Sequence, residues 1–154
     1  MADRLIRISK DKGDLLKNLT EEATSPFETY ADVMIFAASL GYKRKKIVPL
    51  EEVAKKPEPI RPSIFTHRGY DSVINLLAIS YTKDPKVLGS DEESRNEKIR
   101  IFEEYANGGL EILRDNLKGS VDYLETILLL LISERSSSQI KDREFDLSDL
   151  LLKN

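Results

Sequence analysis

Residues 99–117 read IRIFEEYANGGLEILRDNL and form the longest helically periodic stretch of the chain. Gly108 and Gly109 fall inside the pattern, and two adjacent glycines cost about 2 kcal/mol of helix propensity relative to alanine. The apolar stripe nevertheless keeps its phase across the glycine pair. We therefore expect one helix against which another backbone packs closely at the glycines. The apolar positions at helical steps are Ile99, Phe102, Ala106, Leu110, Leu113 and Leu117.

A second apolar helix is predicted from residue 27 to about residue 42. Ser25, Pro26 and Glu28 match a helix start, with a capping hydroxyl, a proline at the first helical position and an acidic residue three positions after the cap. Apolar residues follow on two neighbouring stripes, so we expect this helix to be buried nearly all round. Gly41 is expected to end it.

The N-terminal segment predicts a short strand over residues 4–9, with Ile6 and Ile8 on one face. A helix with a narrow apolar stripe follows over residues 10–19. Strand, helix, turn and helix within 42 residues is the outline of a ribbon-helix-helix unit, in which the strands of two protomers pair antiparallel. A helical domain with an extended N-terminal arm fits the pattern equally well.

The predicted fold is mainly α: a short N-terminal strand followed by a helical bundle, with a ribbon-helix-helix-like core and added C-terminal helices. We expect helices over residues 71–81 and 121–133, the second as a core helix or an oligomer contact. The predicted domains are one helical domain at 1–135, comprising a ribbon-helix-helix-like part at 4–46, a Pro-rich connector with at most two helical turns at 47–66 and a helical part at 67–135, then a polar arm with an amphipathic end at 136–154. The arm either folds back on the body or docks on a partner.

Composition excludes several kinds of chemistry. The 154 residues contain no Cys and a single His, which excludes disulfides, thiolate metal sites, a cysteine nucleophile and an imidazole pair. No phosphate-binding loop is present, and the carboxylate pairs at 51–52, 92–93 and 103–104 are interpreted as solvated helix faces. His67 is interpreted as a cap or surface residue. We therefore predict no enzyme, no catalytic residue, no metal and no cofactor.

The sequence shows neither a membrane-spanning segment nor a secretory signal. The longest apolar run, residues 127–132, has six residues, whereas about 18–20 are needed to cross a bilayer. The first residues show no secretory pattern. We expect a cytoplasmic protein with no membrane contact.

Charge is distributed unevenly along the chain. Residues 1–68 contain 13 Lys/Arg and 10 Asp/Glu, a net charge of +3, whereas residues 69–154 contain 11 and 17, a net charge of −6. Basic side chains on the strand, on the first helix and in the run after the second helix are candidate phosphate contacts on DNA. The run fits a solvated helix end equally well. The candidates are Arg7, Lys10, Lys12, Lys17, Lys43, Arg44, Lys45 and Lys46.

Three segments resemble a known family. Residues 27–42, 68–71 and 102–110 are similar to the Dnd-associated protein four family, whose members are encoded beside bacterial DNA phosphorothioation genes, and the likeness spans residues 4 to 132. Residues 6–10 and 16–19, the second helix and the helix with the glycine pair are more distantly similar to the DndE subunit. That subunit has a ribbon-helix-helix-like core, assembles as a tetramer and is associated with nicked duplex DNA.

The resemblance implies a non-enzymatic accessory of a DNA phosphorothioation system, a restriction-modification system linked to phage defence. Its implied partners are DNA and other Dnd modification or restriction proteins, and it implies a homo-oligomer, dimer or tetramer. The likeness to DndE gives Lys17 and its basic neighbours the DNA-contact role. The alternative is a protein–protein adaptor of the same system with no direct DNA contact. The connector, the helix at 121–132 and the acidic C-terminal part depart from DndE.

Overall fold

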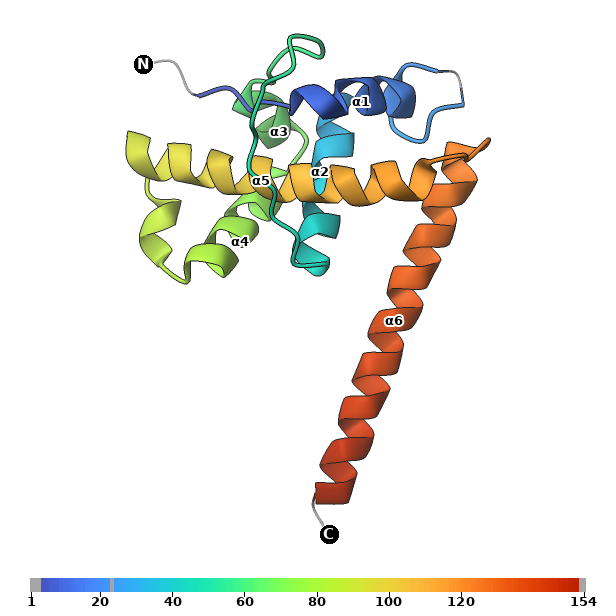
Figure 1. The fold of residues 1–154 in the computed structure, drawn as a ribbon. Helices are drawn as coiled ribbons and strands as arrows, with labels where there is room; N and C mark the ends of the chain where they lie inside the picture. Colours follow the sequence, from blue (N-terminus) through green and yellow to red (C-terminus); the bar gives the residue numbers. More distant parts are fainter. Residues whose placement is uncertain (1–3, 23, 153–154) are drawn as a thin grey trace. The chain divides into compact units, whose positions relative to one another are not determined.

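The computed structural model describes residues 4–22 and 24–152, with side chains up to residue 137. The described part is mainly helical, as predicted (Figure 1). Its helices are α1 (Gly13–Thr20), α2 (Tyr30–Lys43), α3 (Pro62–His67), α4 (Asp71–Thr82), α5 (Glu92–Leu117) and α6 (Tyr123–Leu152), with 3-10 turns η1 (Lys10–Lys12) and η2 (Pro85–Leu88).

The centre of the fold is the crossing of α2 and α5, which make the most extensive contact between any two elements (Figure 1). A Cβ atom on Gly109 would lie 1.7 Å from the carbonyl oxygen of Ala37, and one on Gly41 would lie 2.2 Å from that of Tyr105. Only glycine allows two backbones to approach so closely. The predicted close packing is therefore confirmed, and the apolar stripe of α5 is buried along its whole length.

The start of α2 differs from the prediction. Thr29, not Ser25, caps the helix: its hydroxyl accepts from the Asp32 N–H, and the Asp32 carboxylate accepts from the Thr29 N–H, each at 3.2 Å. Both the predicted and the observed stretch contain a capping pattern. The observed one is selected because the Phe27 N–H donates to the Leu19 carbonyl at the end of α1, which holds Phe27 outside the helix.

The N-terminal segment makes two isolated antiparallel bridges, Ile6 to Ile60 and Ser9 to Val53, with the connector of its own chain. The predicted strand and ribbon-helix-helix core are therefore not found in the described part of the chain. One backbone edge of this segment is already bonded within the chain, since Ile6 and Ile60 exchange two hydrogen bonds of 2.8 Å. The prediction that Ile6 and Ile8 share a buried face is confirmed.

Up to two helical turns were predicted in the connector, but residues 47–61 form no helix. Their backbone instead forms the bridges to Ile6 and Ser9. Its last residues start α3, with Pro62 in the first turn. The helix predicted at 71–81 is confirmed as α4, which packs on α5 together with η2. Together with α2, the elements α4 and η2 therefore pack around α5.

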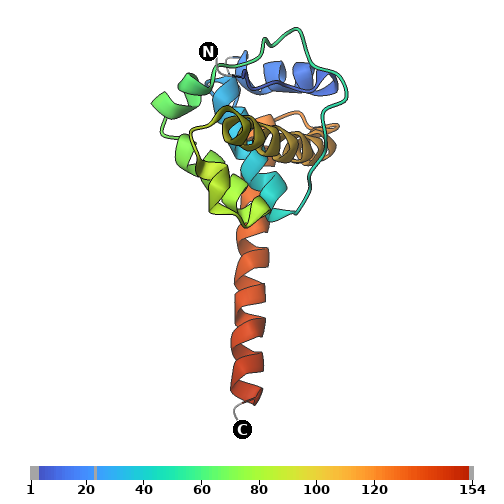
Figure 2. The same ribbon diagram turned by 90° about the vertical axis from the view of Figure 1, so that its left-hand side faces the viewer.

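The chain divides into two compact units, residues 1–118 and 119–154. The second contains α6, which runs unbroken through the predicted boundary at 135–136 (Figure 2). Ile127 and Leu130 are buried. Of the two alternatives for the helix at 121–133, the central core helix is not observed, because five of its large apolar side chains are 45–60% exposed, and the oligomer contact stays a prediction. These side chains are Leu124, Leu128, Leu129, Leu131 and Ile132. The central buried helix is α5 instead.

Candidate functional site

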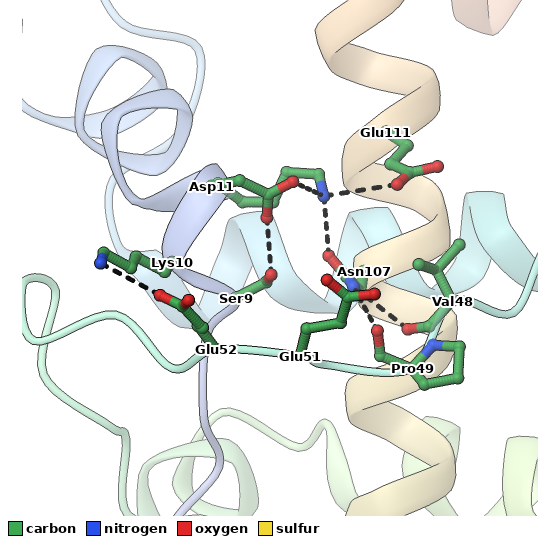
Figure 3. A pocket seen from close by; sticks show the side chains of 10 residues that line it. Ser9, Lys10, Asp11, Val48, Pro49, Glu51, Glu52, Asn107 and Glu111 are labelled. Carbon is green, nitrogen blue, oxygen red and sulfur yellow. Dashed lines mark hydrogen bonds and ion pairs between the residues drawn. The ribbon is translucent and has the colours of Figure 1, made fainter.

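Lys12 is one of the residues that line a pocket of about 550 Å³ between η1, the connector and α5. Figure 3 shows Asp11, Asn107 and Glu111 in the same lining. Lys12 is 1% exposed, and its Nζ lies 3.0 Å from Asp11 Oδ2, 3.0 Å from Asn107 Oδ1 and 3.7 Å from Glu111 Oε1. A buried ammonium needs such partners. The charge of Lys12, one of the predicted DNA contacts, is therefore used inside the fold.

Arg7 is also committed to an internal contact. Its Nε and Nη2 each lie 3.0 Å from the carboxylate of Glu103, which also accepts the Arg7 backbone N–H at 2.7 Å. Arg4 Nη2 adds a contact of 2.8 Å to the same carboxylate. Glu103 is 1% exposed, so the interpretation of residues 103–104 as a solvated pair is wrong for this residue. The Arg7 side chain therefore contacts α5 and is only partly exposed to solvent.

A third polar cluster joins the start of α2 to the loop between α3 and α4. Asp32 accepts from Arg68 Nη1 at 2.9 Å and from the Tyr70 hydroxyl at 2.5 Å. Partial burial acts to raise the pKa of Asp32, but the hydrogen bonds from Tyr70 and Thr29 and the charge of Arg68 outweigh it and hold the pKa below its ordinary value. Two of the segments that carry the family resemblance thus meet here in a structural role.

The other predicted contacts lie at the surface or near it. Lys10 and Lys46 pair with Glu52 at 3.0 Å and with Glu111 at 3.1 Å. The side chains of residues 43–45 are exposed at the carboxyl end of α2. The structure does not bring the eight candidates into one surface. Ion pairs with acidic residues of the chain are formed by Arg7, Lys10, Lys12 and Lys46.

Lys17 lines a different cleft, of about 750 Å³, together with Lys56 and Arg61. Sequence reasoning did not single out these two connector cations. Residues 47–62 contain three Lys/Arg and three Asp/Glu, so their net charge is zero and no charge run marks them. Only folding the connector over α1 places them beside Lys17.

The described residues show no group of three or more His, Cys, Asp or Glu side chains that could hold a metal ion. His67 is exposed at the end of α3. Among the described helices, none has the length and apolarity needed to cross a membrane.

These observations define a class: a small helical protein that uses many of its charges in internal ion pairs and keeps further cations at its surface. The family model of DNA sulphur modification system-associated protein 4 matches residues 5–150, and the chain belongs to this family. The resemblance to the Dnd-associated proteins is thereby confirmed. The family description is that of a protein associated with a DNA sulphur modification system. No curated protein and no solved structure matches the chain.

Proposed function

We propose that this chain is a non-enzymatic accessory that contacts the DNA backbone through cations of its N-terminal half. The observation that carries the proposal is the exposed basic run Lys43, Arg44 and Lys45 at the end of α2. Exposed Lys and Arg side chains bind DNA by neutralising phosphates and releasing counterions. Such contacts position a protein on DNA without reading its sequence. A family tied to DNA modification supports this use of the charge.

The proposal extends to partners and assembly. The proposed protein partners are other Dnd modification or restriction proteins. We place the protein in the cytoplasm, in a system that acts against phage DNA. A homo-oligomer, dimer or tetramer, is proposed as the binding form. Light scattering at increasing protein concentration measures the mass, and a monomer at every concentration would reject the oligomer while leaving DNA contact testable.

The test is a salt titration of binding to duplex DNA. We expect the triple variant Lys43→Glu, Arg44→Glu, Lys45→Glu to lose DNA retention and to lower the slope of log affinity against log salt by about 2.7, since each phosphate contact contributes roughly 0.9. Lys46 is left unchanged because, unlike residues 43–45, it is only partly exposed. Exposed charges contribute little stability, so the variant should remain folded.

The matched control is Lys83→Glu, Lys86→Glu, Lys118→Glu, which makes the same charge change at exposed positions outside the basic run. Equal loss of binding in the control would reject the run as a site. No binding of the unchanged protein at about 50 mM salt, where phosphate contacts are strong, would reject DNA contact altogether.

The second candidate function, an adaptor without DNA contact, is favoured by one observation. Five large apolar side chains of α6 between residues 124 and 132 are 45–60% exposed, and contiguous apolar surface commonly marks a protein interaction site. The two functions are separated by the same titration, because the adaptor predicts no salt-dependent DNA binding.

A further inference from the structure

The cleft that contains Lys17 is built from four elements that meet only in the folded chain. Lys17 comes from α1, Glu21 directly follows the end of that helix, and residues 29–31 come from the start of α2. Residues 56–61 of the connector and Ile64 of α3 complete it. The connector lies directly on α1, since a Cβ on Gly13 would be 2.8 Å from the Lys56 carbonyl oxygen. The cleft is therefore part of the packed body of residues 1–118.

Three cations line this cleft without internal partners. Lys17, Lys56 and Arg61 form no ion pair with any residue of the described chain. By contrast, Arg4, Lys12 and Arg68 each have a carboxylate within 3.0 Å. Of the two acidic residues in the cleft, Glu21 accepts a hydrogen bond from the Tyr30 hydroxyl. The three cations outnumber the two carboxylates of the lining, Glu21 and Glu58, so the cleft has a net charge of +1 and favours an anion.

The same cleft contains apolar surface. Pro57, Pro59, Ile60 and Ile64 line it together with the ring of Tyr30. Ile64 is 43% exposed although it is a large aliphatic side chain. The volume of about 750 Å³ lies in the range of roughly 300–1,000 Å³ that encloses small ligands. The cleft thus offers an apolar wall beside cations, which fits a ligand with a flat apolar group between phosphates.

We propose that this cleft binds an unpaired nucleotide of single-stranded DNA, with Lys17, Lys56 and Arg61 on its flanking phosphates and its base against the apolar wall. The inference rests on the proposed DNA contact and names its substrate class. Duplex DNA stacks its bases inside and presents a convex backbone, so it cannot place a base against Ile64. Proteins that bind single strands combine a cationic groove with apolar and aromatic surfaces for the bases.

The experiment measures fluorescence anisotropy of a labelled twelve-nucleotide thymidine strand and of a blunt duplex, each across a salt series. The variant Lys56→Glu, Arg61→Glu is expected to bind the single strand at least about tenfold more weakly, with a salt slope reduced by roughly 1.4 for two phosphate contacts. The control Lys55→Glu, Lys86→Glu makes the same charge change at exposed residues outside the cleft and is expected to stay within about threefold of the unchanged protein.

A second variant, Ile64→Ser, tests the apolar wall without changing charge. It is expected to weaken single-strand binding by about fivefold, because serine removes the apolar surface that the base would cover, while duplex binding and both salt slopes stay unchanged. Urea unfolding of each variant checks that the fold is retained.

Three outcomes would overturn the inference. If the control loses as much affinity as the cleft variant, the effect is one of net charge. If the cleft variant loses duplex binding equally and Ile64→Ser changes nothing, the cations contact duplex phosphates, and the proposed function survives without the single-strand site. If the unchanged protein binds neither DNA, both proposals fall, and an acidic peptide becomes the next ligand to test on the cleft.

Discussion

Glu103 holds the N-terminal segment against α5 with a carboxylate that is almost completely buried. Both its oxygens accept hydrogen bonds, from the guanidinium groups of Arg4 and Arg7 and from the Arg7 backbone N–H. A buried charge is tolerated only when it is paired and hydrogen-bonded in this way. The two arginines are 28% and 39% exposed, so water remains available to them if the carboxylate is removed.

We expect Glu103→Gln to destabilise the protein by about 1–3 kcal/mol, because the new amide places a buried NH2 group, itself a donor, against the donors of Arg4 and Arg7. Urea unfolding at pH 7 measures the change. Glu93→Gln, an exposed acid on the same helix, is the control and should change stability by less than about 0.5 kcal/mol. Similar values for the two variants would contradict the role given to Glu103.

Asp32 makes a pH-dependent contribution. Its pKa in the folded protein lies below the ordinary value, so it stabilises the fold above the unfolded-state pKa of about 3.9 and loses this contribution as pH falls through the lowered pKa. We expect Asp32→Asn to be less stable than the unchanged protein by about 2 kcal/mol at pH 7. The difference should shrink as pH falls below about 4. A constant difference between pH 7 and pH 3, measured by urea unfolding, would rule out this linkage.

At the scale of elements, the crossing of α2 and α5 depends on glycines on both helices. Gly41 of α2 faces the backbone of α5, and Gly108 and Gly109 of α5 face backbone atoms of Lys46 and Ala37. These glycines lower helix propensity, yet they allow the closest contact in the fold. Packing between the helices therefore outweighs local preference at these positions.

Gly109→Ala should destabilise the protein by about 2 kcal/mol, since overpacking against backbone costs about 3 kcal/mol, the upper end of the usual range, and the gain in helix propensity returns only about 1 kcal/mol. Asp115→Ala, at an exposed position of α5, controls for propensity and should be neutral or slightly stabilising. Circular dichroism during thermal unfolding compares the two. A stabilising Gly109→Ala would show that the helices do not approach as closely as described.

At the scale of the whole molecule, residues 1–118 contain the α2–α5 crossing, the bridges of the N-terminal segment and all three polar clusters. The largest completely buried side chains, such as Phe65, Phe102 and Leu113, also belong to this unit. A separate core of this kind is what lets a segment fold as a unit.

We therefore expect deletion of residues 137–154 to leave a folded protein with an unchanged denaturant slope, because that slope follows the surface exposed by the main unfolding transition. Urea unfolding followed by circular dichroism measures it. An insoluble truncation, or a clear loss of the cooperative transition, would instead show that the C-terminal residues belong to the core.

The sequence by itself determined the helices α2, α4 and α5 and the close packing at the glycine pair. Helical periodicity and glycine placement are local properties, so they can be read without knowing the neighbours. The burial of Ile6 and Ile8 followed from alternation in the same way. The cap of α2 could not be chosen from sequence, because two capping patterns compete and a hydrogen bond from Phe27 to Leu19 decides between them.

Only the tertiary structure decided how the charges are used. Arg7 and Lys12 had the sequence pattern of surface cations, but their partners Glu103 and Asn107 lie 96 and 95 positions away along the chain. Pairing of the N-terminal segment with the connector, and the meeting of Lys17 with Lys56 and Arg61, are of the same kind. Ion pairs and clefts depend on distances between side chains that only the folded backbone sets, so no local pattern could have identified them.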